Sequence, residues 1–415
     1  MNRKQLILLL AALAIIGGAG LVLLQHNQKS WTESETQIGQ KLLPKFQVND
    51  VAAIHIQGDS DLTLDRKDDG WHVQERNQYP ANLSQIKELL IKVGDLKVVQ
   101  SDPIGASQLA RMHLAEPGKG ADSAILLEFK DAQGKTLDSL LLGKKHTHQS
   151  DRPSPMPYGD EGFADGRYVM LKSAPETVLT ISDALNTVDP KPADWLSKDF
   201  FKVEKPRAIS LVSTNSTNSW KLSRETESAP WVLADMKPGE VLDSNKVSSL
   251  ASTLSYPSFV DVAADAAPDK TGLDNPLTVT IETFDHFTYN IKIGHKTPEN
   301  DYDLTVTVAA DVPTARVPGK DEKPEEKTKL DKEFQEKAKT IQDRLNKEKS
   351  LANSTYLVNS WLVDPLIRER GQLMVEKEKP AEKKENAGKS ETKPDSTTEP
   401  EPVPAEPEMT PTSPK

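Results

Sequence analysis

Two stretches of the chain, well separated in sequence, follow one pattern. Residues 62–75 read LTLDRKDDGWHVQE, and residues 220–235 read WKLSRETESAPWVLAD. In each, a short run of alternating apolar and polar residues leads through a polar turn to a tryptophan, which begins another alternating run. Alternation at period two is typical of a strand with one buried face, and Asp-Gly readily supplies the positive φ of a tight hairpin. The sequence therefore predicts the same hairpin twice, which an internal duplication explains most simply.

Further landmarks recur in the same order and at similar offsets. The run Ile-His-Ile at 54–56 and its counterpart Ile-Ser-Leu at 209–211 precede the two hairpins. After each hairpin come an apolar-periodic segment, a Leu-x-x-Pro motif and a pair of strand-like runs. In order, these are residues 82–102 and 242–262, Leu114–Pro117 and Leu273–Pro276, and residues 124–145 and 277–297. The residues that mark the repeat are Trp71, Trp231, Pro117 and Pro276.

The apolar-periodic segment of each copy is interpreted as a helix. Asn82 is placed to cap the first one, and Asp243 or Ser244 the second. The predicted buried positions fall on one helical face. They are Ile86, Leu89, Leu90 and Val93 in the first copy, and Val247, Leu250 and Leu254 in the second.

Each copy therefore has the expected order β-β-α-β-β plus a closing strand, such as residues 167–171. The simplest packing of that order is an antiparallel sheet with a helix over one face. We predict an α+β protein with two tandem homologous domains, residues 45–202 and 203–375. The first ends in PKPADWLSKDFFK, whose Trp195, Phe200 and Phe201 are expected to pack between the domains.

The second copy carries a highly charged insertion at residues 321–350. Its apolar residues recur every three or four positions, which predicts a long helix with one narrow apolar stripe. The stripe consists of Leu330, Phe334, Ala338, Ile341 and Leu345. Two interpretations stay open: the stripe packs on its own domain, or it binds a helix of a partner.

An uncharged apolar stretch runs from Gln5 to Leu24, within a predicted membrane anchor at residues 1–30. At ~1.5 Å rise per residue, a helix of this length spans the ~30 Å hydrocarbon core of a bilayer. A cleaved signal peptide is the alternative, although its apolar region is usually shorter. The residues assigned to the anchor are Leu6, Leu10, Ala14, Gly18, Leu21 and Leu24.

The charges that flank this stretch predict its orientation. Arg3 and Lys4 place the N-terminus in the cytoplasm, so the bulk of the chain is expected in the periplasm, with the inner membrane as a partner. Ala14 and Gly18 form a small-xxx-small pair that can contact another transmembrane helix. Such pairs are common in alanine-rich anchors, so the pair alone does not establish a contact.

Composition excludes several kinds of function. The chain has no cysteine, which excludes disulfides, thiolate nucleophiles and Cys-ligated metals. Its net charge of −11 argues against nucleic acid as a partner, because a nucleic-acid surface is basic. Residues 376–415 are rich in Lys, Glu and Pro and contain no aromatic residue, Ile or Leu. A tail of this composition is expected to be disordered.

Several of these motifs together resemble a bacterial family known as domain of unknown function 4340. They are Gly70-Trp71, Pro230-Trp231, the two Leu-x-x-Pro motifs, and the strand ends Leu142-Gly143 and Ile293-Gly294. The resemblance covers about residues 45–320. It implies a membrane anchor followed by tandem β-rich repeats, and no established activity. It also implies an accessory role beside permeases of ABC-type export systems related to gliding-motility transporters. The charged insertion and the tail depart from the pattern of the family.

Candidates for chemistry are few. The histidines of HTHQSD (146–151) lack a third ligand at a metal-binding spacing, and DEGFAD (160–165) lacks the spacing of a calcium loop. Surface histidines and a turn are the favoured interpretations. No hydrolase, metalloprotease or nucleotide-binding motif is present. No catalytic, cofactor-binding or metal-binding residue is assigned, and no cofactor is expected.

The sequence therefore favours a non-enzymatic, membrane-anchored periplasmic scaffold or accessory subunit. The family resemblance alone implies its expected partner, an ABC-type export permease with associated envelope proteins. The alternative is a module that binds the cell wall or a polysaccharide. In that case Trp71 and Trp231 would form a stacking surface, whereas we favour core packing for both. A third interpretation is an envelope hydrolase without a recognisable motif.

Overall fold

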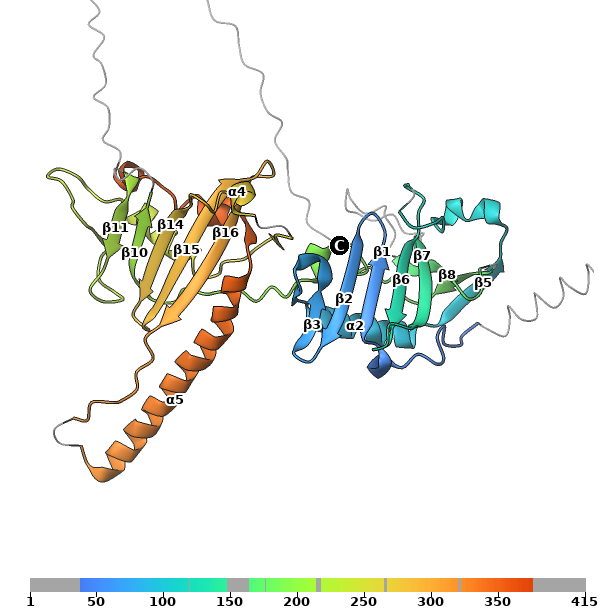
Figure 1. Cartoon of the computed structure of the whole chain (residues 1–415), viewed down its shortest axis with the longest axis horizontal. Coiled ribbons are helices and arrows are strands. Elements are labelled where there is room, and N and C mark those ends of the chain that lie inside the picture. The colour runs from blue at the N-terminus through green and yellow to red at the C-terminus, as the bar shows by residue number, and fades with distance from the viewer. Residues whose placement is uncertain are drawn as a thin grey trace, which may run out of the picture. The chain divides into compact units, whose positions relative to one another are not determined.

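The described strands form two antiparallel sheets, and helices lie between the strands in the sequence (Figure 1). The computed structural model describes residues 38–375, apart from 119, 148–163, 176, 214–217, 265–266 and 320–321. The predicted α+β class is confirmed. The predicted anchor, residues 1–30, and the predicted disordered tail, residues 376–415, lie outside the described residues. Within the described ranges, no helix is long and apolar enough to cross a membrane.

Sheet 1 has the strand order β4-β3-β2-β1-β6-β7-β8-β9-β5. Its hairpins β1–β2 and β2–β3 are those predicted around Trp71, and β8 includes the predicted closing strand. The strands are β1 (Ala53–Gln57), β2 (Asp61–Lys67), β3 (Gly70–Val73), β4 (Tyr79–Pro80), β5 (Val98–Pro103), β6 (Ile125–Lys130), β7 (Thr136–Thr147), β8 (Ala164–Leu171) and β9 (Thr177–Ile181).

Sheet 2 has the order β12-β11-β10-β14-β15-β16-β17-β13. Read from β3 and from β12, the two sheets have the same order, and sheet 1 adds β4 at that edge. The strands are β10 (Pro206–Val212), β11 (Trp220–Ser223), β12 (Val232–Leu233), β13 (Asp261–Val262), β14 (Leu277–Thr283), β15 (Phe287–Lys296), β16 (Asp301–Ala310) and β17 (Tyr356–Asn359).

The registers of the two sheets also agree. Ile56 lies opposite Leu62 in sheet 1, and Leu211 lies opposite Trp220 in sheet 2. In the next pair of strands, Leu64 faces Val73 and Leu222 faces Leu233. These are the correspondences that the repeated sequence pattern predicts.

Each sheet has a bulge at the same place. The pairing of β7 with β8 shifts between Leu142 and Lys145, and that of β15 with β16 shifts between Ile293 and Lys296. The bulges contain Gly143 and Gly294. A Cβ on Gly143 would overlap the carbonyl oxygen of Met112, and a Cβ on Gly294 that of Thr271.

The Leu-x-x-Pro motifs are part of the same arrangement. Met112 and Thr271 each end a short helical turn two residues before the leucine of the motif. The next residue has positive φ in both copies, His113 at 52° and Gly272 at 73°. The turn before each motif therefore crosses the bulge glycine, where only glycine leaves room for the carbonyl.

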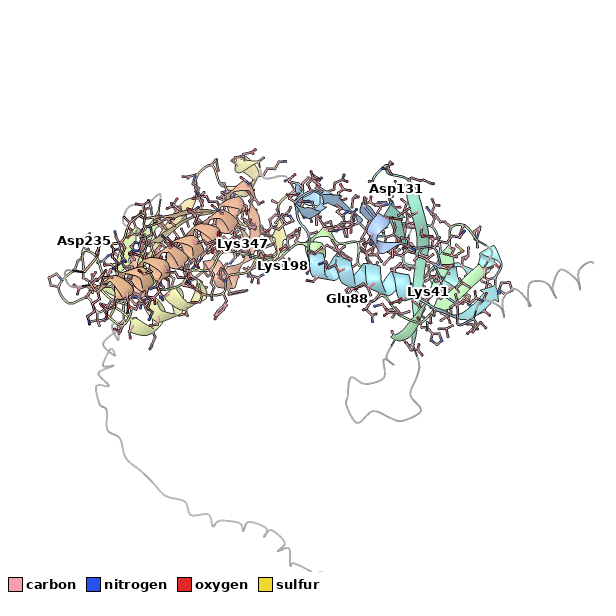
Figure 2. The ribbon with its side chains drawn as sticks, turned by 90° about the horizontal axis from the view of Figure 1, so that it is seen from below. Lys41, Glu88, Asp131, Lys198, Asp235 and Lys347 are labelled. Carbon is pink, nitrogen blue, oxygen red and sulfur yellow. The ribbon has the colours of Figure 1, made fainter. Side chains whose placement is uncertain are left out.

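Helix α2 (Leu83–Asp95) lies across one face of sheet 1, and Figure 2 shows it with its labelled Glu88. The Asn82 side chain accepts a hydrogen bond from the Gln85 N–H at 3.3 Å, and the Asp243 side chain accepts from two N–H groups at the start of α3 (Ser244–Thr253). Both predicted caps are confirmed. The other helices are α4 (Pro268–Thr271), α5 (Pro324–Lys349) and α6 (Ser360–Val363).

The helical interpretation of residues 82–102 is too long. Helix α2 ends at Asp95, and Leu96 turns to extended backbone (φ −55°, ψ 133°). Buried Val98 and exposed Val99 then alternate in β5, which pairs with β9 at the edge of the sheet. Two adjacent β-branched residues favour this strand over another helical turn.

The segment between the sheets is held by buried aromatic residues. Trp195 is fully buried and its Nε1–H donates to the Asp189 carbonyl oxygen at 2.7 Å. Phe201 packs on the ring of Tyr289 in β15, with 5.7 Å between centroids. The predicted boundary at 202/203 therefore lies in a chain segment that is anchored by its aromatic residues.

Candidate partner-binding surface at helix α5

Helix α5 begins and ends as its charges dictate. Pro324 occupies its first turn together with Glu325 and Glu326, and Lys347 and Lys349 lie in its last turn. Proline suits the first helical position, and acidic residues at the start with basic residues at the end complement the helix dipole. The helix predicted within 321–350 is thus confirmed.

Only the C-terminal part of α5 is part of the core. Leu345 is 4% exposed and Ile341 packs against the core, whereas Phe334 and Ala338 are half-buried. Leu330, at the other end of the predicted stripe, is 38% exposed. Figure 1 shows the same gradient, because the C-terminal turns of α5 lie beside β16 and its N-terminal turns run past the ends of the strands. Each of the two interpretations of the stripe thus suits a different part of it.

A polar network fixes the docked part of the helix. Arg344 donates to Glu348 Oε1 at 2.9 Å and to the Tyr289 hydroxyl at 2.8 Å, and also to the carbonyl oxygen of Lys202. The Tyr289 hydroxyl lies 2.9 Å from Glu348 Oε2. Burial alone would lower the pKa of Arg344, but the hydrogen bond to Glu348 and the neighbouring charges outweigh burial and raise it. Arg344 and buried Glu348 therefore form a charged pair at the base of the helix.

A second ion cluster holds the start of α5 to the preceding loop. The Arg316 guanidinium pairs with Glu322, and its Nε donates to Asp331 Oδ1 at 2.8 Å. The hydrogen bond from Arg316, together with one from the Gly319 N–H, lowers the pKa of Glu322 to about 2. Glu322 therefore stays ionised at neutral pH, so its pairing with Arg316 persists over the physiological range.

A groove of about 690 Å³ separates α5 from the β14–β15 turn. Helix residues line one wall, and the turn with the strand start supplies the other. The apolar lining consists of Phe334, Ala338, Ile341, Phe284, Phe287 and Pro313. The charged residues at the groove are Glu204, Lys205, Asp285, Glu333, Glu336, Lys337 and Arg344. An apolar floor with charges of both signs around it suits an amphipathic helix better than a small apolar ligand.

Ring contacts and hydrogen bonds hold the base of the groove in place. The Arg344 guanidinium carbon lies 4.5 Å from the centre of the Phe287 ring, which stacks on Tyr289. The Thr283 hydroxyl and the Phe287 backbone close the β14–β15 turn through two hydrogen bonds, at 2.9 and 3.2 Å. A partner would therefore meet a preformed surface on this side.

The other predicted candidates lie elsewhere. Trp71 is 8% exposed in β3, and Trp231 is half-buried before β12, where the Arg224 guanidinium lies 4.8 Å from its ring centre. His146 Nδ1 lies 2.7 Å from Asp165 Oδ1, while His148, Asp151, Asp160 and Glu161 lie outside the described residues. In the part of the chain that is described, no three His, Asp or Glu residues form a group that could hold a metal ion.

Sequence analysis missed two features of the charged residues. The Arg344–Tyr289–Glu348 network joins residues far apart in sequence, and no local periodicity indicates it. The second feature is the burial of Arg167 in β8, which the sequence pattern does indicate. Arg167 shares the inward parity of Val169 in the run GRYVML, where a strand normally has an apolar residue.

Comparison with known proteins gives one match. A family model described as Domain of unknown function (DUF4340) matches residues 158–276. The matched range includes β8 and β9 of sheet 1 and continues through β13 and α4, so it contains Trp231 and Pro276 but not Trp71 or Pro117. The match is shorter than the 45–320 that the resemblance predicts. No curated protein and no solved structure matched the chain.

Proposed function

We propose, from the premise that residues 158–276 belong to the DUF4340 family, that this chain is a non-enzymatic scaffold or accessory subunit of a cell-envelope complex. The family has no known function, so the proposal depends on the chain itself. Its main support is the partly docked helix α5, which carries half-buried Phe334 and exposed Leu330 beside a preformed groove.

The proposed occupant of the groove is an amphipathic helix of a partner protein. A narrow apolar stripe with charged flanks is the pattern by which two helices pack side by side. On α5 the faces beside the stripe carry Lys–Glu and Lys–Asp ion pairs four residues apart, so that these outward faces stay solvated. The stripe is the one apolar strip that this part of the helix offers.

The predicted anchor and the family resemblance together suggest the class of partner. With residues 1–30 as a single inner-membrane helix and the sheets in the periplasm, α5 would meet other envelope proteins. We propose the permease of an ABC-type export system, because the family resemblance implies that neighbourhood. The two sheets, with one strand order and one bulge position, are proposed to descend from a duplication of one α+β domain.

The alternative proposal, a wall- or polysaccharide-binding module, has less support. It needs exposed aromatic rings, whereas Trp71 is buried and one face of Trp231 lies against Arg224. Quenching of tryptophan fluorescence by wall glycans would favour this alternative, since a buried ring does not respond.

Site-specific photo-crosslinking in intact cells tests the proposal. A photoreactive residue is placed at Leu330 or Phe334 on the stripe, and at Lys339 on the outward face as the matched control. We expect a polytopic permease and its ATPase from the two stripe positions and not from position 339. Equal capture from both faces, or capture of peptidoglycan-associated proteins alone, would contradict the proposal.

A substitution pair adds a second readout. Phe334→Glu places a charge in the groove, whereas Lys339→Glu changes a charge on the outward face. Only the first is expected to reduce recovery of the permease, by about tenfold, the loss typical of one buried apolar contact. The full-length chain serves for all variants.

A further inference from the structure

Arg167 is a buried cation, and no carboxylate among the described residues forms an ion pair with it. It is 6% exposed, its Nε donates to the Gly143 carbonyl oxygen at 2.8 Å, and Nη1 lies 3.5 Å from the Leu185 carbonyl oxygen. Of the residues that the structure describes, none places a carboxylate within 4.0 Å of the guanidinium. Burial lowers the pKa of Arg167 to about 10, so the group is still charged at neutral pH. A buried charge is costly unless an opposite charge pairs with it.

Sheet 2 has a neutral side chain at the same position, and a nearby carboxylate satisfies it. Arg167 stands two residues before Val169, which pairs with Leu142 next to the bulge, and Tyr302 stands two residues before Leu304, which pairs with Ile293. The Tyr302 hydroxyl donates to Asp364 Oδ1 at 3.0 Å. The polar contact at this position of sheet 2 is therefore closed within the protein.

The carboxylate that could have done the same for Arg167 is engaged elsewhere. Asp364 belongs to the sequence Val-Asp-Pro at 363–365, and sheet 1 has the same three residues at 188–190. Asp189 Oδ1, however, accepts from the Lys191 N–H at 2.9 Å and forms no ion pair with Arg167. Both sheets thus have the Val-Asp-Pro carboxylate, which contacts the inward strand residue in sheet 2 and the Lys191 backbone in sheet 1.

Sheet 1 has a cavity of about 330 Å³ in this place. Arg167 lines it together with the β1–β2 turn and with residues 120, 121 and 123–125. Sheet 2 has no counterpart of that wall, because Pro276 leads directly into β14, whereas Pro117 is separated from β6 by a loop. The added loop contains two glycines with positive φ, Gly118 and Gly120, that allow its tight course.

The charges at the cavity are mixed and are arranged by depth. Arg167 is the buried charge, and Lys191, 71% exposed in its side chain, lies at the mouth. His113 and two carboxylates, Asp59 and Asp189, also line it. Asp59 is exposed and Asp189 lies beside Lys191, with 4.0 Å between Oδ2 and Nζ, so neither carboxylate pairs with Arg167 at the buried, deep end of the cavity.

We propose that this cavity binds a small ligand through a carboxylate or phosphate group, which the Arg167 guanidinium holds at the deep end. The N–H donors of a guanidinium match both carboxylate and phosphate in geometry. A bound anion would supply the negative charge that the described residues do not place beside Arg167. The site belongs to sheet 1 and does not depend on helix α5 or its partner.

Ligand-dependent thermal stability of the full-length chain in mild detergent tests the proposal. The probes are sodium phosphate and disodium succinate, each compared with sodium chloride at equal ionic strength in Tris buffer. We expect one of them, in roughly tenfold excess over its Kd, to raise Tm by about 3 °C. Phosphate and succinate distinguish the two anion classes that share this chemistry.

Three variants locate the effect. Arg167→Gln removes the charge and Ala121→Phe obstructs the cavity from an exposed loop, and each is expected to abolish the shift. Arg207→Gln changes an exposed arginine on sheet 2 that pairs with Glu282 and is expected to keep it. The shift is read within each variant, with and without anion, so a lower basal Tm does not obscure it.

The outcomes are decisive in both directions. Loss of the shift in Arg167→Gln or, where that variant does not fold, in Ala121→Phe supports the site. No anion-dependent shift in the unmodified chain overturns the proposal and leaves Arg167 a structural donor to two carbonyl groups. A shift that persists in both cavity variants also overturns it, since the anion then binds elsewhere.

Discussion

The two sheets share one framework of strands and differ in a cavity, in inward side chains and in an inserted helix. Strand order, register, bulge position and helix cap recur. Sheet 1 has an open cavity beside Arg167, whereas Tyr302 and Asp364 make a hydrogen bond at that place in sheet 2. Sheet 2 also has helix α5 between β16 and β17 in the sequence. The comparison teaches that the two sheets share their backbone geometry. Their surfaces differ because of insertions and of single inward-facing side chains.

The strongest test of the common framework is its bulge. Gly143→Val and Gly294→Val each force a side chain into a backbone carbonyl, which cannot move without shifting the Leu-x-x-Pro segment. Both should lose about 3 kcal/mol of stability in denaturant unfolding, at the high end of overpacking effects. Gly105→Val, where a Cβ meets nothing within 4 Å, is the control. A small loss at either bulge would show that the two copies do not depend on it equally.

Helix α5 sharpens the comparison of the sheets, because its two ends should respond differently. Leu345→Ala removes a side chain that is buried in the core and should cost about 2–4 kcal/mol. Leu330→Ala changes an exposed residue and should stay within about 0.5 kcal/mol. Urea unfolding of both variants measures the difference. Equal losses would mean that the whole stripe belongs to the core, and the proposed partner surface would be withdrawn.

The helix caps test whether the copies use the same local device with equal effect. Asn82→Ala removes one hydrogen bond to a helix N–H, and Asp243→Ala removes two, so each should cost about 1 kcal/mol with the second larger. Thermal unfolding monitored by circular dichroism gives the values. Conservative changes to Asp at 82 and Asn at 243 are expected to retain stability, and failure to do so would point to a role other than capping.

The smallest effect concerns Tyr302 and appears chiefly at alkaline pH. Burial first, and then the hydrogen bond to Asp364, raise the pKa of Tyr302 to about 12. The contribution of Tyr302 to the free energy of unfolding is fully present below the unfolded pKa of tyrosine, about 10. That contribution is lost as pH rises through the folded pKa of Tyr302. Tyr302→Phe should therefore cost about 1 kcal/mol at neutral pH, the worth of one hydrogen bond, and lose less stability than the unmodified chain above pH ~10. Parallel pH slopes for the two proteins would contradict this assignment.

The sequence predicted what depends on local pattern. The hairpins around Trp71 and before Trp231, the caps at Asn82 and Asp243, and helix α5 all follow from alternation, spacing or turn chemistry within a few residues. Strand β5 was missed because the helical period of α2 runs on into Leu96 and Val98, and only pairing with β9 decides for a strand.

The features of the candidate sites were less predictable, because they depend on distant partners. Arg344 is placed by the Tyr289 hydroxyl and the Lys202 carbonyl oxygen, neither of which the stripe pattern contains. Arg167 was recognisable as a charged residue at an inward position, but whether it has a counter-charge depends on how the Val-Asp-Pro segment at 188–190 folds back. Periodicity places such a residue on a face and cannot say what opposes it.

The insertion of α5 also sets an order of events during folding. A short turn joins β8 to β9, but residues 311–355 separate β16 from β17, and closing so long a loop costs about 2 kcal/mol more. Strand β17 should therefore join sheet 2 after β9 has completed sheet 1, since non-local pairing is slow. Until then we expect the edge of β16 to stay unpaired, and we expect the docking of α5 through Leu345 and Arg344 to bring β17 close to it. One helix would thus determine both how sheet 2 is completed and what the finished protein can bind.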